Sequence, residues 1–208
     1  ATGLTAETVY YPHGVHVDVA GNISSVVTGS SFTTDVAPPS FTSLVKSSAA
    51  YSAPQSGATT SAIDTTGANL IVVAAAYNPI AAVPDITDSK GNTWTPLTAQ
   101  NNGTTSRIYY CYNPTVGSGH TFTISKVGTN VYGASCVHAF SGAAASPFEA
   151  ENGGNGASGT TGSAGTGVTP AQNSELVIAA VALFDSGASN SIDSINGGFT
   201  VSNSIGHL

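Results

Sequence analysis

One pattern occurs twice along this chain. LIVVAAAY at residues 70–77 and LVIAAVALF at residues 176–184 are runs of small apolar residues, and each precedes a polar loop, an acidic turn and an aromatic residue, Trp94 or Phe199. Runs of this length, bounded by turn residues, are typical of buried strands. Because each copy presents an apolar face that only another layer can cover, the repeat predicts the two halves of one β-sandwich.

The two copies differ in length. After Trp94 the first copy continues through the strand-like runs RIYYCYN, HTFTISKV and VYGASCVHAF, whereas the second ends at Leu208, soon after Phe199. We therefore expect a sandwich that spans residues 40–208, is built of two half-repeats and lacks the closing strands of its second half.

The rest of the chain also favours strands over helices. The runs FTSLVKSSA and ATTSAI precede the first copy, and turn residues such as Ser89-Lys90-Gly91-Asn92 separate the predicted strands. No segment has both the period and the length of a helix. A Gly/Ser/Thr-rich tract at residues 150–169 is predicted to connect the two halves as a long loop. The predicted fold class is therefore all-β, an antiparallel β-sandwich.

The first 39 residues form a separate predicted unit. VYYPHGVHVDVAGNISSVV predicts two short strands that pair across Ala20-Gly21-Asn22, and Pro38-Pro39 marks a boundary with the sandwich. A lone hairpin of this size is marginally stable in water. We therefore expect residues 1–39 to be an N-terminal arm that contacts other subunits of an assembly.

Composition narrows the classes of partner. Charged residues make up 7% of the 208 residues, and the formal net charge is −7 with four basic residues. An average soluble protein has about 25% charged residues. So few cations disfavour binding to a phosphate backbone, and no apolar run approaches the roughly 20 residues of a membrane helix. No nucleic acid, membrane insertion or cofactor is expected.

Several short motifs resemble a jelly-roll-like domain with a D-S-x-G-N-T-W motif that is found in phage virion proteins and bacterial secreted proteins. The matching residues are LIVVAAAY (70–77), DSKGNTWT (88–95), IYYCYNP (108–114), HAFSG (138–142), SPFEA (146–150) and ELVIAA (175–180). The resemblance covers about four-fifths of the chain. It implies a jelly-roll-like antiparallel sandwich. Because such domains are mostly appendages of larger proteins, it implies no particular reaction.

Oxygen-bearing side chains crowd one loop of the first copy. Asp85, Asp88 and Asn92 supply the ligand type that Ca²⁺ prefers, although their spacing is not that of an EF-hand loop. Asp and Asn are equally common turn formers whose side chains bond their own backbone. Both a calcium site and a plain turn are compatible with these residues.

A second metal candidate lies in the N-terminal arm. His16 and Asp18 share one strand face at i, i+2, near His13, and could bind a transition metal with a further ligand from elsewhere. A solvated or subunit-contacting strand explains these residues equally well.

Two aromatic residues are candidates for ligand binding. Trp94, the only tryptophan, could stack on a sugar ring, but its counterpart Phe199 is a core residue type, so the repeat favours a core position for Trp94. Tyr109, Tyr110 and Tyr112 place aromatic rings on both faces of one strand, so that either Tyr110 is outside while Tyr109 and Cys111 point inward, or the reverse; Tyr110 is the candidate for ligand binding.

Residues for catalysis are not grouped in the sequence. There is no nucleophile elbow, and the acidic residues are scattered without evident pairing. His120 and His138 have no acidic neighbour in the sequence and are expected to be structural. Cys111 and Cys136 can form a disulfide if their strands are neighbours and otherwise are small core residues. The chain is therefore predicted not to be an enzyme.

These observations favour a non-enzymatic structural protein on the surface of a larger assembly. A phage virion protein, such as a capsid-decoration, head-fibre or tail-surface subunit, fits the low charge, the arm and the open strand edges, which would contact other virion subunits. The alternative is a carbohydrate-binding or adhesion module of a secreted bacterial protein, with a cell-surface glycan as ligand. Either function implies a location on the virion surface or outside the cell.

Overall fold

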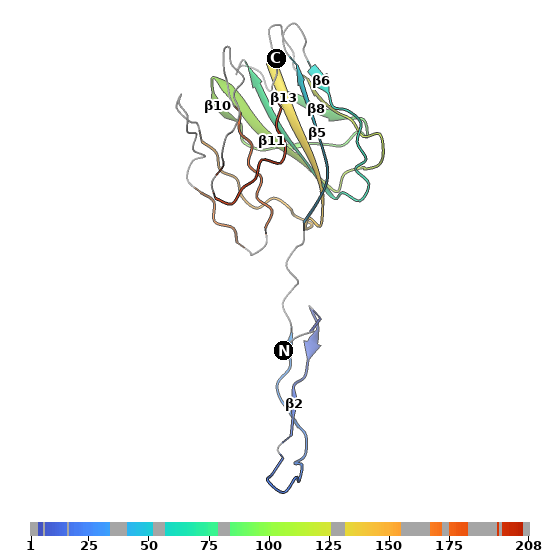
Figure 1. The fold of residues 1–208 in the computed structure, drawn as a ribbon, viewed down its shortest axis with the longest axis vertical. Coiled ribbons are helices and arrows are strands. Elements are labelled where there is room, and N and C mark those ends of the chain that lie inside the picture. The colour runs from blue at the N-terminus through green and yellow to red at the C-terminus, as the bar shows by residue number, and fades with distance from the viewer. Residues whose placement is uncertain are drawn as a thin grey trace. The chain divides into compact units, whose positions relative to one another are not determined.

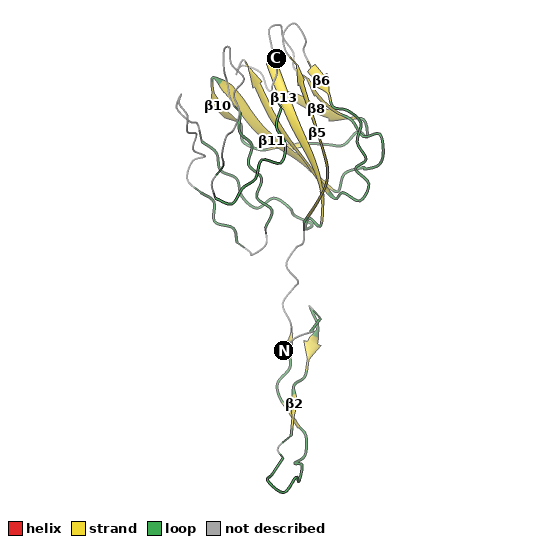
Figure 2. Ribbon diagram, in the orientation of Figure 1, coloured by secondary structure: helices red, strands yellow, loops and turns green. Residues whose placement is uncertain are grey.

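The computed structural model describes residues 4–5, 7–15, 17–33, 41–51, 57–78, 84–125, 132–154, 167–171, 175–182, 195 and 197–205. Every regular element in these ranges is a β-strand, which confirms the all-β prediction (Figures 1 and 2). No helix that could cross a membrane occurs in the described ranges. The chain divides into two compact units, Ala1–Pro38 and Pro39–Leu208.

The first unit is a two-stranded antiparallel ribbon. Its pairs are β1 (Val9–Tyr10) with β4 (Phe32–Thr33), and β2 (His13–Gly14) with β3 (Val27–Thr28). A bridge between Val17 and Ile23 continues the ladder toward a turn at residues 18–22. The register shifts by one residue from each pair to the next, so the ribbon is one hairpin with two irregularities. The turn lies where the sequence predicts it, around Ala20-Gly21-Asn22.

The second unit has two antiparallel sheets. The larger has the order β10-β11-β7-β13-β5, with β9 also pairing β11. Its strands are β5 (Thr42–Tyr51), β7 (Leu70–Asn78), β9 (Thr95–Pro96), β10 (Gln100–Asn102), β11 (Thr104–Tyr112) and β13 (Tyr132–Ser141). The smaller sheet has the order β6-β12-β8. Its strands are β6 (Gly57–Thr59), β8 (Asp85–Asp88) and β12 (Phe122–Ser125).

The strand order follows a jelly roll. If β9 and β10 are counted as one position, the strands from β5 to β13 occupy eight positions along the chain. The larger sheet has the first, eighth, third and sixth positions side by side, and the smaller sheet has the second, seventh and fourth. The fifth position, β9 and β10, pairs with β11 instead of β8. The jelly-roll-like sandwich expected from the sequence is therefore observed, with one strand position moved between sheets.

The core lies between the two sheets. Alternate residues of the long strands, such as Ile71, Val73 and Val137, point inward from the larger sheet and are nearly or fully buried. Phe122 and Ile124 of β12 face them from the smaller sheet and are 1% exposed. Burial of side chains of this size stabilises a fold by about 1.5–3 kcal/mol each.

The outer face of the larger sheet is also partly covered. Leu70 and Val72 of β7 are buried on this face, so the start of β7 is buried on both sides, which explains its unbroken apolar run. Leu176 and Ile178 pack against the same cluster. A segment distant in the sequence therefore covers part of the outer face of the larger sheet, outside the sandwich core.

The second copy of the repeat does not form the strand that the sequence predicts at Leu176–Phe184, because the described residues 175–182 contain no strand. Residues 42–141 alone supply both described sheets of the sandwich. The inner face of β7, the strand of the first copy, is therefore covered by β12 and its neighbours. The second copy packs instead against the outer face of the larger sheet. Phe199, the predicted core counterpart of Trp94, is exposed.

Candidate functional site

The turn after β8 is organised by the carboxylate of Asp88, whose side chain is fully buried. Its Oδ1 accepts hydrogen bonds from the backbone N–H of Lys90 (2.8 Å) and from Nδ2 of Asn92 (3.1 Å). Its Oδ2 accepts a hydrogen bond from Nε1 of Trp94 (3.0 Å). Gly91 adopts φ +73° in this turn, which glycine does without strain. The D-S-x-G-N-T-W motif thus forms a turn that is stabilised by hydrogen bonds within the motif and that orients the tryptophan.

The same turn is tied to the loop that precedes β12. Oδ1 of Asn92 accepts a hydrogen bond from the backbone N–H of Thr115 (2.6 Å), and its Nδ2 donates to the carbonyl of Thr115 (3.1 Å). Lys90 donates from Nζ to the carbonyl of Ser118 (3.0 Å). These bonds hold two loops together at one end of the sandwich.

Asp88 also completes a chain of three polar side chains. Nε2 of His120 lies 3.0 Å from Oδ1 of Asp88, and Nδ1 of His120 lies 2.9 Å from Oγ1 of Thr65. A hydroxyl, an imidazole and a carboxylate are the residue types of a hydrolase triad. All three side chains are fully buried, however, and His120 stacks on Phe122 at 4.2 Å, so a substrate has no access to the hydroxyl. The arrangement is structural, as expected for His120.

The three calcium candidates do not converge. Asp85 is exposed and Asp88 points into the sandwich, because residues three apart on a strand face opposite sides. The carboxylate of Asp88 faces N–H donors, and the amide of Asn92 bonds Thr115. Within the described ranges, no group of three or more His, Cys, Asp or Glu side chains could hold a metal ion. Asp88 and Asn92 therefore fit the turn-forming alternative.

The other metal candidate is only partly visible, because His16 lies outside the described residues. Asp18 stabilises the hairpin turn: its Oδ1 accepts from the backbone N–H groups of Ala20 and Asn22, both at 2.9 Å, and its Oδ2 accepts from Nδ2 of Asn22 at 2.8 Å. These bonds, that from the Asn22 side chain foremost, lower the pKa of the Asp18 carboxyl group. The observed role of Asp18 is to hold the turn.

The two aromatic candidates have different surroundings. Trp94 is half-buried, packs against the core and meets Phe122 edge to face at 6.0 Å. Tyr110 belongs to the cluster on the outer face of the larger sheet, and its ring stacks on Phe148 at 6.0 Å with an interplanar angle of 11°. Both rings are thus partly buried, Trp94 against the core between the sheets and Tyr110 against the cluster on the outer face.

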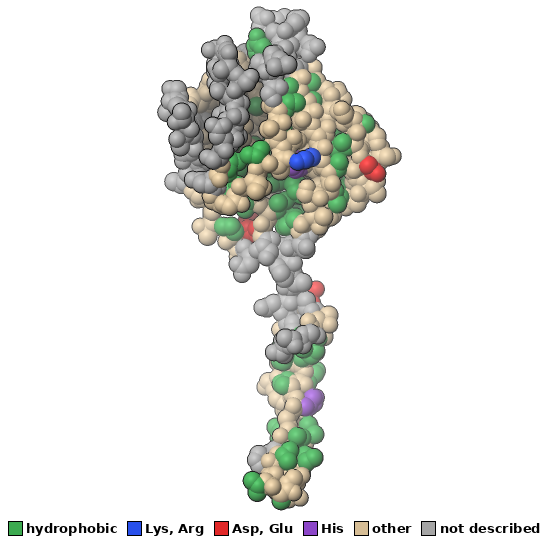
Figure 3. All heavy atoms as spheres, in the orientation of Figure 1, with side chains coloured by type: hydrophobic (Ala, Val, Ile, Leu, Met, Phe, Trp, Pro, Cys, Tyr) green, Lys and Arg blue, Asp and Glu red, His purple; other side chains and the backbone are tan. Residues whose placement is uncertain are grey.

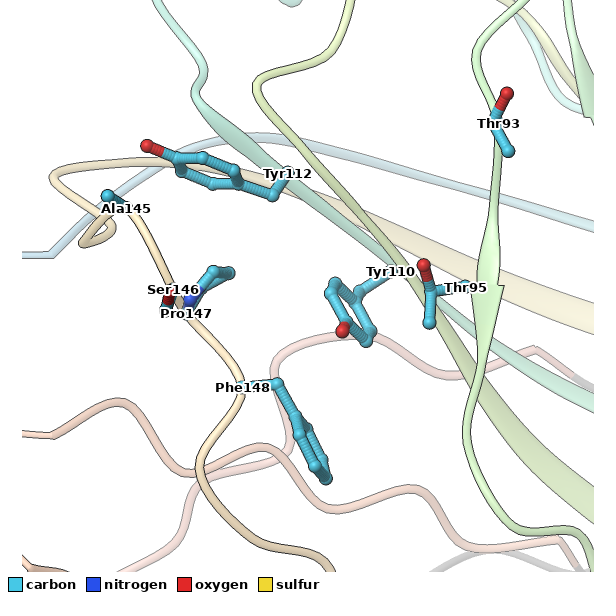
Figure 4. A pocket seen from close by; sticks show the side chains of 8 residues that line it. All are labelled: Thr93, Thr95, Tyr110, Tyr112, Ala145, Ser146, Pro147 and Phe148. Atoms are coloured by element: carbon cyan, nitrogen blue, oxygen red, sulfur yellow. The ribbon is translucent and has the colours of Figure 1, made fainter.

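An open groove of about 530 Å³ lies beside Tyr110 (Figure 4). Three aromatic rings and three hydroxyl side chains take part in its lining, together with one alanine and one proline. The lining residues are Thr93, Thr95, Tyr110, Tyr112, Ala145, Ser146, Pro147 and Phe148. None of these side chains carries a charge at neutral pH. The i, i+2 spacing of the two tyrosines and the SPFEA motif are the sequence signals for this site.

One wall of the groove is fixed by strand geometry. Thr95 pairs directly with Tyr110 across β9 and β11, so both side chains lie on the same face. Thr93 and Thr95 flank Trp94, whose side chain points into the core, and side chains alternate along an extended segment. The hydrogen bond from Trp94 to Asp88 therefore also sets the position of the two threonines. Figure 4 shows both threonines at the groove.

The opposite wall is the segment that follows β13. Ala143 and Asn69 exchange two hydrogen bonds: Nδ2 of Asn69 donates to the Ala143 carbonyl (2.8 Å), and the Ala143 N–H donates to Oδ1 of Asn69 (3.0 Å). Farther along, the Glu151 carboxylate accepts from the backbone N–H (3.0 Å) and from Oγ1 (2.6 Å) of Thr98. The segment that carries Phe148 is thus hydrogen-bonded to the sandwich both before and after Phe148 in the sequence.

The two cysteines are free. Their strands β11 and β13 flank β7 and do not pair with each other, and Cys111 pairs with Ile71 whereas Cys136 pairs with Ala74. Those partners lie on opposite faces of β7, which keeps the two thiols apart. Burial raises the pKa of both thiols. The core alternative therefore holds for Cys111, which is buried, whereas Cys136 is only partly buried and lies on the outer face of the sheet.

Comparison with known proteins adds no assignment to this geometry. No protein family, no curated protein and no solved structure matches the chain.

Proposed function

We propose that this chain is a non-enzymatic surface subunit of a larger assembly, of the kind that decorates a phage capsid, forms a head fibre or covers a tail, and that its N-terminal hairpin holds it there. The observation that supports this proposal is the exposure of apolar side chains along the hairpin (Figure 3). The exposed large apolar residues are Leu4, Val9, Tyr11, Val15, Val17, Val19, Ile23, Val26, Val27 and Phe32.

A two-stranded ribbon without an apolar core has little to stabilise it in water. Among the described residues of the hairpin, the stacking of Tyr10 on Phe32 at 6.0 Å is the aromatic contact available to it. Exposed apolar side chains grouped in this way are typical of surfaces that other proteins cover. Strands can also join the edge of a neighbouring sheet through their backbone groups.

One buried cluster of polar side chains among the described residues has the residue types of a catalytic triad, and its burial favours a structural role for it. The Thr65, His120 and Asp88 chain is sealed inside the sandwich, where it bonds loops together. A carbohydrate-binding or adhesion module of a secreted protein is the alternative. The Trp94 ring packs against the core and donates a hydrogen bond to Asp88, which disfavours it as a stacking platform for that alternative. The groove beside Tyr110 is compatible with either a virion subunit or a secreted module. The preference for an assembly subunit therefore rests on the exposed apolar residues of the hairpin.

Incorporation into the assembly tests the proposal. Particles would be assembled with the full chain, with a chain that lacks residues 1–38, and with the double variant Val17→Ser/Ile23→Ser, and then purified on a density gradient. A matched control, Val177→Ser/Val181→Ser, replaces two exposed valines of the second unit. We expect the control to copurify with particles as the full chain does, and both hairpin variants to remain unbound while they melt normally. Normal incorporation of the truncated chain would contradict the proposal.

A further inference from the structure

We infer that the groove formed by Tyr110, Tyr112 and Phe148 binds a neutral saccharide. This inference goes beyond the proposed assembly role and does not depend on it, because none of the groove residues belongs to the N-terminal hairpin. The groove volume of about 530 Å³ falls within the roughly 300–1,000 Å³ of typical small-molecule sites.

The aromatic rings supply the apolar part of the recognition. Phe148 is 43% exposed and Tyr112 is 36% exposed, although both are large aromatic residues. The Tyr110 and Phe148 rings are almost parallel, at 11°. A pyranose ring has an apolar face of C–H groups, which packs against aromatic faces of this kind. Because Tyr110 and Phe148 stack on each other, the partly exposed rings of Phe148 and Tyr112 are the ones on which a sugar can stack.

The hydroxyl groups supply the polar part. Thr93, Thr95 and Ser146 border the same groove (Figure 4). Each hydroxyl both donates and accepts hydrogen bonds, as every sugar hydroxyl does. None of the described residues that line the groove is charged, and the chain as a whole has a net charge of −7, so an uncharged sugar suits the site better than an anionic one.

The walls of the groove are held in place without a ligand. Trp94 fixes the threonine side through its bond to Asp88, and the pairing of Ala143 with Asn69 fixes the start of the Phe148 segment. Because the walls are already ordered, binding to this site costs little conformational entropy of the protein. A ligand with a small contact area can therefore still bind with measurable affinity.

A proline-rich peptide is the other ligand class that docks on aromatic grooves. Its backbone offers carbonyl acceptors but few donors, because proline has no N–H group. The three hydroxyl side chains of this groove can pair with donors as well as acceptors, which favours the saccharide.

Calorimetric titration of the full chain tests the inference. The probes are malto-, cello-, laminari-, manno- and xylohexaose, with a decaproline peptide as the competing class. Tyr112→Ala is the site variant, and Tyr132→Ala is its matched control, because Tyr132 is 37% exposed on another strand of the same sheet and lies outside the groove. Thr95→Val removes one hydroxyl with little change of shape.

We expect at least one hexaose to bind, Tyr112→Ala to weaken its binding about tenfold, Thr95→Val to weaken it several-fold, and Tyr132→Ala to leave it unchanged. All variants should melt as the unaltered chain does, which separates loss of binding from loss of folding. Equal binding by Tyr112→Ala and Tyr132→Ala would overturn the assignment of the site. Binding of none of the hexaoses, or of decaproline alone, would overturn the saccharide.

Discussion

Replacing Asp88 by alanine should destabilise the sandwich strongly. The carboxylate accepts hydrogen bonds from Nε2 of His120 and Nε1 of Trp94, both at 3.0 Å. Without it these two donors point into a space with no acceptor. A buried donor that loses its partner costs about 1–3 kcal/mol, so the two together give about 2–6 kcal/mol. For a domain of this size that free energy corresponds to a fall in Tm of about 4–24 °C.

Thermal unfolding followed by circular dichroism measures this effect, and Asp64→Ala is the matched control. Asp64 also bonds within a turn, through the backbone N–H (3.0 Å) and Oγ1 (2.7 Å) of Thr66, but its carboxylate is fully exposed. We expect the control to melt close to the unaltered chain. Asp88→Asn should fall between the two, since it keeps one acceptor oxygen and introduces an amide donor. A Tm for Asp88→Ala equal to that of Asp64→Ala would refute the buried-network argument.

Three further predictions concern other parts of the sandwich. Cys111 and Cys136 should both titrate with a thiol reagent after unfolding and react much more slowly in the native chain, since burial raises the pKa of both thiols; an unreactive unfolded chain would indicate a disulfide. Burial also lowers the pKa of His138 below its usual 6.5, so the unfolded chain binds the proton first and stability should fall as the pH drops below about 6.5; urea unfolding at several pH values should show a smaller fall for His138→Gln. Gly57→Ala should lower stability by about 1–3 kcal/mol, because the new Cβ would lie 2.8 Å from the carbonyl oxygen of Ile124, and an unchanged urea midpoint would contradict this.

The long strands could be predicted because their sequences are continuous or alternating apolar runs, which are typical of strands. The apolar run of β7 and the alternating runs of β11 and β13 are found where the sequence predicts strands. The strand β8 was missed, since Asp85–Asp88 has one inward apolar residue, Ile86, between residues that also form turns. The inner face of the first copy is covered by strands that follow it in the sequence, and the second copy packs on the outer face. The local sequence pattern shows that both faces are apolar but does not show which segment covers each one.

The two clusters of functional interest depend on contacts between distant segments. His120 meets Asp88 across 32 residues of sequence, and nothing near either residue marks the pair. The groove joins residues on both sides of Trp94 to β11 and to the segment after β13. Sequence alone could single out Tyr110 as a candidate but could not supply Phe148 as its partner, because their contact requires the folded strand order.

The first strand of the sandwich is also an edge strand, which has a mechanical consequence. Among the described strands of the larger sheet, β5 pairs with β13 alone, and this pairing is irregular between Ala139 and Phe140, close to the start of β5. The hairpin precedes β5 along the chain, so tension applied through the hairpin loads β5 before any other strand. An edge strand drawn away from its sheet at one end loses its hydrogen bonds one after another, and the irregular pairing lies among the first to be loaded. Under such a load β5 would detach first, while β7, held by both β11 and β13, would stay in the sheet.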